Sequence, residues 1–86
     1  MRRYNLLAQV KQADPLYKAP LVELAGDCRV VVENHLGVLA YATEEISIKV
    51  NYGNICIQGD GLCLCELSRD QLVITGSIYS VVLKRR

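Results

Sequence analysis

Short apolar runs separated by turn residues fill the chain from Leu21 to its end, and this pattern is typical of β-strands. Apolar and polar residues alternate most clearly in residues 46–50 and 54–58, which gives each of these strands one apolar face. The expected strands, about seven or eight in number, lie near residues 21–25, 28–34, 38–42, 45–50, 54–58, 62–66, 71–75 and 78–83. The sequence therefore predicts an all-β domain of short, mainly antiparallel strands.

One stretch, residues 29–41, is predicted to form a hairpin. Its first five residues are rich in β-branched side chains, and its last four are a second apolar run. Asn34 and Gly37 lie between the two runs, and both residue types accept the left-handed backbone angles of a tight turn. The candidate turn and contact residues are Glu33, Asn34, His35 and Gly37.

Further turns are expected at residues 51–53, 59–61 and 68–70, where Gly, Asn, Asp and Ser gather. Gly76 is either another turn or a bend within one long final strand. This spacing fits an antiparallel meander rolled into a small sandwich or barrel. A short β-solenoid is the alternative, because the strands resemble loose repeats. The meander is preferred, since the turns differ in length and chemistry whereas solenoid turns are alike.

The segment before the strands predicts a short amphipathic helix. Tyr4, Leu6, Leu7 and Val10 follow a helical spacing of three and four residues, and the Asp14-Pro15 step ends the helix. The chain is thus divided into residues 1–18, helix and linker, and residues 19–86, a single β domain. Leu6, Leu7 and Val10 are candidate interaction residues, because such a helix can lie on a membrane surface or on a partner protein.

The composition limits how the domain can be stabilised. A chain of 86 residues buries only about 60–65% of its unfolded surface, so its core is thin. Phe and Trp are absent, and the core must therefore be built from Val, Ile, Leu and Ala. The sequence has no apolar run of about 18 residues and no secretory leader, so neither a membrane span nor secretion is expected.

The net charge of +1 conceals a segregation of charge along the chain. Residues 1–18 carry four cations and one anion, residues 19–83 carry three cations and eight anions, and residues 84–86 are all cations. A small nucleic-acid-binding barrel is one alternative function, but it would require basic, aromatic strand faces. Because the predicted strands are acidic, binding to nucleic acid is not expected.

No catalytic site is expected from the polar residues. His35 is the only histidine, and no serine or cysteine lies in a recognisable nucleophile motif near it. Glu33 would share a strand face with His35 only if the strand continued through the turn. We therefore interpret these two residues as turn or contact residues, and no cofactor is expected.

The four cysteines are expected to be reduced and free of metal. Without a secretory leader, they indicate a reducing compartment, and at least two are predicted to be buried. Cys63 and Cys65 should share one strand face, and Cys56, with Cys28 or His35, would have to complete a zinc site. No CxxC pair is present, so a metal-stabilised module stays an alternative and no metal ligand is assigned.

Several stretches together resemble the YabP/YqfC family of bacterial sporulation proteins. They are residues 20–26, residues 33–41 (Glu-Asn-His-Leu-Gly-Val-Leu-Ala-Tyr), residues 46–48, residues 53–59 and residues 72–76. The leader and the Asp14-Pro15 step resemble the YqfC branch more closely. The resemblance extends from about Leu6 to Val82, and it depends on the order and spacing of motifs that are individually short.

The resemblance implies a sporulation protein made in the mother cell, acting in forespore or cortex development. It also implies a membrane-protein partner and a cytoplasmic location, with peripheral contact at the forespore membrane. Self-association is expected from the strands themselves, because short sheets leave unpaired edges. Residues 30–32 and 79–83 are also apolar on both faces, which is more apolar surface than a thin core can bury. We therefore expect a non-enzymatic β module that acts through protein–protein contacts.

Overall fold

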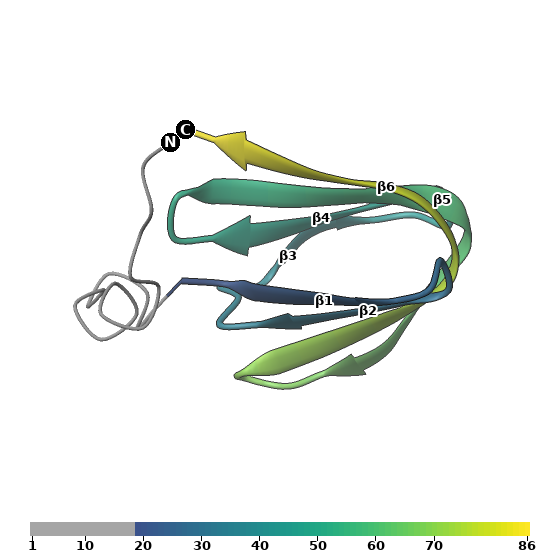
Figure 1. Ribbon diagram of the computed structural model, residues 1–86. Helices are drawn as coiled ribbons and strands as arrows, with labels where there is room; N and C mark the ends of the chain where they lie inside the picture. Colours follow the sequence, from purple (N-terminus) through teal and green to yellow (C-terminus); the bar gives the residue numbers. More distant parts are fainter. Residues whose placement is uncertain (1–18) are drawn as a thin grey trace, which may run out of the picture.

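The computed structural model describes residues 19–86, which form one antiparallel sheet of six strands (Figure 1). The strands are β1 (Leu21–Ala25), β2 (Arg29–Glu33), β3 (Val38–Tyr41), β4 (Glu45–Val50), β5 (Gly53–Leu67) and β6 (Gln71–Arg85). Their order across the sheet is β1-β2-β6-β5-β4-β3. The all-β prediction is confirmed, whereas the predicted leader helix, with Leu6, Leu7 and Val10, lies outside the described residues.

The long strands β5 and β6 bend together and fold the sheet onto itself. Their pairing register shifts between Gln58 and Gly59 and again between Asp60 and Cys63. A Cβ atom at Gly59 would overlap the carbonyl oxygen of Ser77, so the two backbones approach more closely there than a side chain allows. This bend lies at the right of Figure 1, where β5 and β6 turn from one layer into the other.

The bend divides the sheet into two halves of four strand segments each. The β1–β2 half comprises β1 and β2 with residues 71–75 of β6 and residues 63–67 of β5. The β3–β4 half comprises β3 and β4 with residues 53–58 of β5 and residues 79–85 of β6. Each half therefore consists of one short hairpin paired with one end of the long β5–β6 hairpin.

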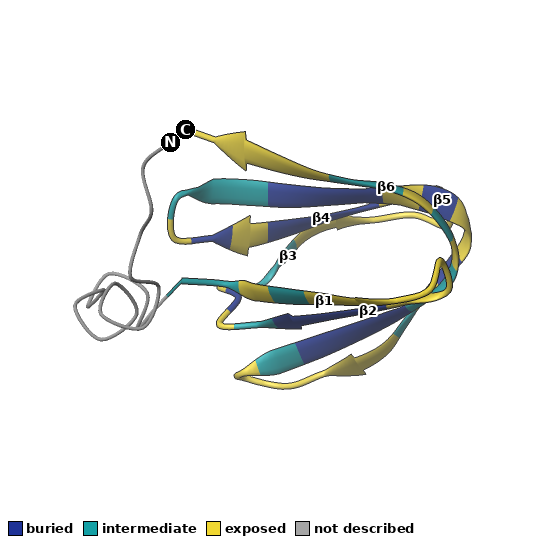
Figure 2. Ribbon diagram, in the orientation of Figure 1, coloured by how far each residue is buried: buried dark blue, intermediate teal, exposed yellow. Residues whose placement is uncertain are grey.

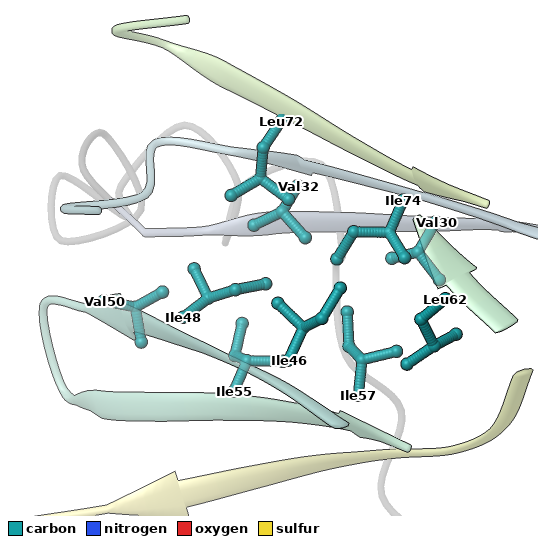
Figure 3. Close-up of a cluster of buried hydrophobic side chains, with 10 residues drawn as sticks. All are labelled: Val30, Val32, Ile46, Ile48, Val50, Ile55, Ile57, Leu62, Leu72 and Ile74. Carbon is teal, nitrogen blue, oxygen red and sulfur yellow. The ribbon is translucent and has the colours of Figure 1, made fainter. Parts of the chain in front are cut away.

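The core lies between the inner faces of the two halves, where side chains from both point toward one another (Figure 3). The buried residues are Val30, Val32, Leu72 and Ile74 from the β1–β2 half, Leu62 from the bend, and Ile46, Ile48, Val50, Ile55 and Ile57 from the β3–β4 half. Most follow the two-residue period of a strand, and all are Val, Ile or Leu, as the composition requires. Burying each of them contributes about 1.5–3 kcal/mol.

The prediction of seven or eight short strands is wrong. Residues 59–61 do not end a strand, because the β5–β6 ladder continues past them through register shifts. Gly76 likewise bends one long final strand, which was one of the two readings of this position. The turns at residues 51–53 and 68–70 are confirmed. The solenoid alternative is also wrong, since every pair of neighbouring strands is antiparallel.

The predicted hairpin of residues 29–41 is wrong as well. β2 pairs with β1 on one side and with β6 on the other, so neither of its edges is open to β3. β3 pairs with β4 instead. Residues 34–37 therefore form a connection between the two halves, and the order of strands is not that of a simple meander.

The turns of the two short hairpins both contact the bend. The carbonyl of Asp27, in the β1–β2 turn, accepts a hydrogen bond from the Ile78 N–H at 2.8 Å. The carbonyl of Glu44, in the β3–β4 turn, accepts one from the Gly59 N–H at 3.0 Å. The two halves are thus built on the same plan, and each hairpin is fixed at the end where the sheet folds.

Candidate interaction site

The connection between the halves lies at the end of the sheet opposite the bend. Asn34 has a φ of 62°, which confirms the expected left-handed conformation. Its backbone N–H donates to the Asp70 carbonyl at 2.9 Å, and its Nδ2 donates to the Ala19 carbonyl at 3.0 Å. Asn34 therefore joins the connection to the β5–β6 turn and to the residues that precede β1.

His35 is buried in this connection and both of its ring nitrogens are engaged. Nδ1 accepts a hydrogen bond from the Gly37 N–H at 3.0 Å. Nε2 must then carry the hydrogen, and it donates to the Ser68 carbonyl at 2.8 Å. Neither nitrogen is free to act on a substrate in this arrangement. His35 thus fixes the connection to the β5–β6 turn, as the turn interpretation expects.

An open groove of about 710 Å³ surrounds the connection. It is lined by Asn34, His35, Leu36, Gly37, Asn51, Arg69 and Asp70. Three of the four candidate turn and contact residues line this groove, whereas Glu33 is half-buried at the end of β2, opposite Gln71. The groove has one exposed apolar residue, Leu36, beside one cation and one carboxylate, so its lining favours no single class of ligand.

A second candidate lies on β6, where residues 79–85 pair with a strand on one side only. β5 occupies one side, while β2 reaches only residues 71–75, so no strand of residues 19–86 covers the other side. We call this segment, residues 79–85, the open edge of β6. Three of its side chains are exposed apolar or aromatic residues, Tyr79 (68%), Val82 (39%) and Leu83 (60%). Figure 2 shows this end of β6 as a largely exposed strand.

The register shows which backbone groups of this edge are unpaired. The Arg86 N–H donates to the Tyr52 carbonyl at 3.0 Å, so the neighbouring pair Arg85 and Gly53 does not exchange hydrogen bonds. By the alternation of an antiparallel ladder, Val81 and Leu83 direct their N–H and C=O groups away from β5. The open edge of β6 therefore presents backbone donors and acceptors to a further strand.

One backbone group of the corresponding edge of β5 is paired with a side chain instead. Residues 63–67 of β5 also pair with a strand on one side only, but the Leu64 N–H donates to Tyr41 Oη at 3.1 Å. Tyr41 lies on β3, so this bond connects the two halves along one side of the sheet. The sequence did not predict this contact, because Tyr41 and Leu64 are 23 residues apart and only the arrangement of the strands brings them together.

The cysteines differ from the prediction, because only Cys56 is buried. Cys63 and Cys65 do share one face, but it is the outer face, since Leu62 takes the core position between the halves. Hydrogen bonding to Cys65 and the charge of that thiol raise the pKa of the Cys63 thiol, and Tyr41 opposes the shift. Among residues 19–86, no three His, Cys, Asp or Glu side chains are grouped as metal ligands.

Comparison with known proteins identifies the family. The model of the YabP family matches residues 18–86, which include all six strands and the connection at His35. The curated proteins and the solved structures each gave no match to the chain. Within the described residues, no helix is long and apolar enough to cross a membrane. Because the match covers the whole folded sheet, the chain belongs to the YabP family.

Proposed function

We propose that this chain is a non-enzymatic sporulation protein that acts through contacts with other proteins. Membership of the YabP family suggests a sporulation-related role. The likeness of the leader to the YqfC branch supports the finer proposal, in which the protein is made in the mother cell and acts in forespore or cortex development. Its location is the cytoplasm, with peripheral contact at the forespore membrane.

The open edge of β6 is the observation that carries the contact function. Its unpaired backbone groups and its exposed Tyr79, Val82 and Leu83 form one continuous strand. Strand addition at such an edge pairs the backbone groups and covers the apolar side chains in a single step. An edge of this kind also exposes a soluble protein to unwanted pairing, so a specific partner is the simplest reason for keeping it uncovered.

Two occupants suit this edge, a second copy of the chain and a membrane-protein partner. A second copy can add its own edge strand, and pairing between two different edges would produce a ring or a filament. A membrane protein can add one extended segment to the same edge, so the two partners would compete. Of these two partners we favour a second copy of the chain, because self-association requires no other protein.

Sedimentation velocity of the full chain over a dilution series tests the proposal. We expect a concentration-dependent shift from monomer to oligomer at physiological salt, and Leu83→Lys should abolish it, because a charge on an edge opposes strand addition. Leu67→Lys is the matched control, since Leu67 is exposed to a similar degree (54%) but lies on β5, away from the open edge of β6. A chain that stays monomeric at every concentration would show that self-association is wrong.

The membrane-protein partner has its own test. Affinity capture from sporulating cells should recover a membrane protein with the wild-type chain and with Leu67→Lys, but not with Leu83→Lys. Equal recovery by both variants would place the contact away from the open edge of β6. The alternatives have less support, because residues 19–83 are acidic and no group of metal-ligating residues occurs among the described ones.

A further inference from the structure

The outer face of the β3–β4 half carries a row of basic residues whose side chains take no part in the core or in the backbone pairing proposed at the open edge of β6. Lys49 on β4 lies opposite Asn54 on β5, and Asn54 lies opposite Lys84 on β6. Lys49 stands between the buried Ile48 and Val50, so it points away from the core, and the row lies on the outer face. Three strands therefore place two lysines on the same surface, separated by one amide.

A depression of about 370 Å³ beside this row is lined by further cationic residues. It is lined by Leu39, Lys49, Gly53, Asn54, Lys84, Arg85 and Arg86. The lining thus contains four cationic residues and no Asp or Glu, although the protein as a whole has a net charge of only +1. Such a concentration of one sign of charge attracts anions.

Two of these cations are held by neighbouring groups. Arg86 Nη2 donates to the Asn51 carbonyl at 2.9 Å. The Arg85 guanidinium lies 5.7 Å from the centre of the Tyr52 ring, within the range of a cation–π contact. The β4–β5 turn thus positions both arginines. Arg86 shares the alternation of Lys84 and stays beside the lysine row, whereas Arg85, opposite Gly53, points to the other side of the strand.

Exposed apolar side chains lie next to the basic row. Leu39, on β3, is 57% exposed and lines the same depression as Lys49. Val82, on β6, is 39% exposed and lies opposite Cys56, on the face that points away from the core. Lysine and arginine beside exposed aliphatic residues suit a membrane surface, because the apolar groups enter the headgroup boundary while the long cationic side chains reach the phosphates.

Nucleic acid fits this face less well. Proteins that bind single strands provide aromatic side chains on which the bases stack. The depression has no aromatic residue in its lining, and the nearby Tyr52 ring faces the Arg85 guanidinium. Toward the bend, the same outer face carries Glu45, which pairs across the ladder with Gln58, so the basic region is short.

We propose that the outer face of the β3–β4 half binds an anionic lipid surface through Lys49, Lys84 and Arg86, with Leu39 and Val82 at the headgroup boundary. This contact goes beyond the strand pairing at the open edge of β6 and does not require it. It differs also from contact through the leader helix, because the residues belong to the sheet. The protein would thus lie with this face of the sheet on an anionic membrane.

Co-sedimentation with vesicles tests this proposal on the full chain. We expect binding to vesicles of phosphatidylcholine with 30% phosphatidylglycerol (about one lipid in three), weak binding to phosphatidylcholine alone, and a decrease as salt screens the charges. Each cation near an anionic surface contributes about fivefold to partitioning, so Lys49→Gln/Lys84→Gln should weaken binding about 25-fold. The protein concentration is kept in the monomer range, so that self-association does not affect the result.

A matched variant, Arg29→Gln/Arg69→Gln, removes two exposed cations of the β1–β2 half and of its turn. It should retain binding, and circular dichroism should show that both double variants keep the wild-type melting temperature. Equal loss in the two double variants, equal binding to neutral and anionic vesicles, or no binding at all would overturn the proposal. An oligonucleotide that binds this face while vesicles do not would identify nucleic acid as the ligand instead.

Discussion

The two halves of the sheet share one plan but end in different edges. In the β1–β2 half the segment of the long hairpin at the edge is residues 63–67 of β5, and Tyr41 accepts a hydrogen bond from its Leu64 N–H. In the β3–β4 half the outer segment is residues 79–85 of β6, and no strand of residues 19–86 lies beside it. β1 and β3 are the terminal strands of the sheet and also pair on one side only. The comparison therefore concerns the two further edges that the long β5–β6 hairpin forms, and we assign the open edge of β6 to a partner.

One residue position accounts for much of this difference. Tyr41 directly precedes Ala42, whose carbonyl accepts the turn hydrogen bond from Glu45 at 3.3 Å. In the other short hairpin, Leu24 directly precedes Ala25, whose carbonyl accepts the equivalent bond from Cys28 at 3.3 Å. Leu24 therefore takes the position of Tyr41, but it has no hydroxyl with which to accept a hydrogen bond from an edge amide. The equivalent positions in the two short hairpins thus differ in whether their side chain can accept a hydrogen bond.

The largest effect is expected at the bend, because both halves depend on it. Gly59→Ala places a Cβ atom on the Ser77 carbonyl, and we expect it to cost about 3 kcal/mol or more, a large share of a small domain's stability. Urea unfolding followed by circular dichroism measures the loss. Gly37→Ala is the control, since its φ of 120° is strained for alanine but the space around it is open, and about 1 kcal/mol is expected. A smaller loss at Gly59 than at Gly37 would contradict the role of the bend.

A second effect is expected at the connection between the halves. His35→Ala leaves the Gly37 N–H and the Ser68 carbonyl without their partner, which should cost about 2 kcal/mol. Thermal unfolding measures this loss. Glu33→Gln, at the neighbouring half-buried position, should change stability by less than about 0.5 kcal/mol. If both variants melted at the wild-type temperature, His35 would not fix the connection to the β5–β6 turn.

Removing the Tyr41 hydroxyl should make the two edges more alike. Tyr41→Phe deletes the acceptor of the Leu64 N–H, so we expect a loss of about 1 kcal/mol and faster hydrogen exchange at that amide. It should also increase self-association, since the Leu64 N–H at the edge of β5 becomes available for strand pairing. Exchange at Leu64 that is unchanged in the variant would show that this bond does not cover the edge of β5.

The smallest effect concerns Tyr79, at the beginning of the open edge. Its hydroxyl donates to Asp60, and this hydrogen bond, together with burial and the charge of Asp60, raises the pKa of Tyr79. Because the folded-state pKa exceeds the unfolded value, this contribution to stability is present below about pH 10 and is lost as the pH rises through the folded-state pKa. Melting temperatures measured up to about pH 11 should therefore fall more steeply for the wild type than for Tyr79→Phe. Parallel curves would contradict the shift.

The sequence predicted the composition of the core and the left-handed turn residues, because both depend on local chemistry. Alternation in residues 46–50 and 54–58 correctly separated inner from outer faces. It did not predict the strand pairing, since residues 29–33 have the same pattern whether their neighbour is β3 or β6. The sequence also did not distinguish the bend at Gly59 from a turn. Glycine permits either conformation, and only the strand register shows that the β5–β6 ladder continues past Gly59.

The candidate sites were predictable to different degrees. Asn34 and Gly37 were found from their turn chemistry, and His35 from being the only histidine. An apolar contact surface was expected at residues 79–83, which lie on the open edge, and at residues 30–32, which are buried instead. The basic row was missed because Lys49 and Lys84 are 35 positions apart, and cross-strand register alone places them together.

Amide hydrogen exchange at the open edge tests the central claim most directly. The amides of Val81 and Leu83 point away from β5, so they should exchange rapidly in a dilute sample and become protected at high concentration, where a second copy adds to the edge. The Leu64 amide, which is covered by Tyr41, should be protected equally in both samples. Protection of Val81 and Leu83 in the dilute monomer, or rapid exchange of both in an oligomer, would contradict the assignment of this edge to a partner.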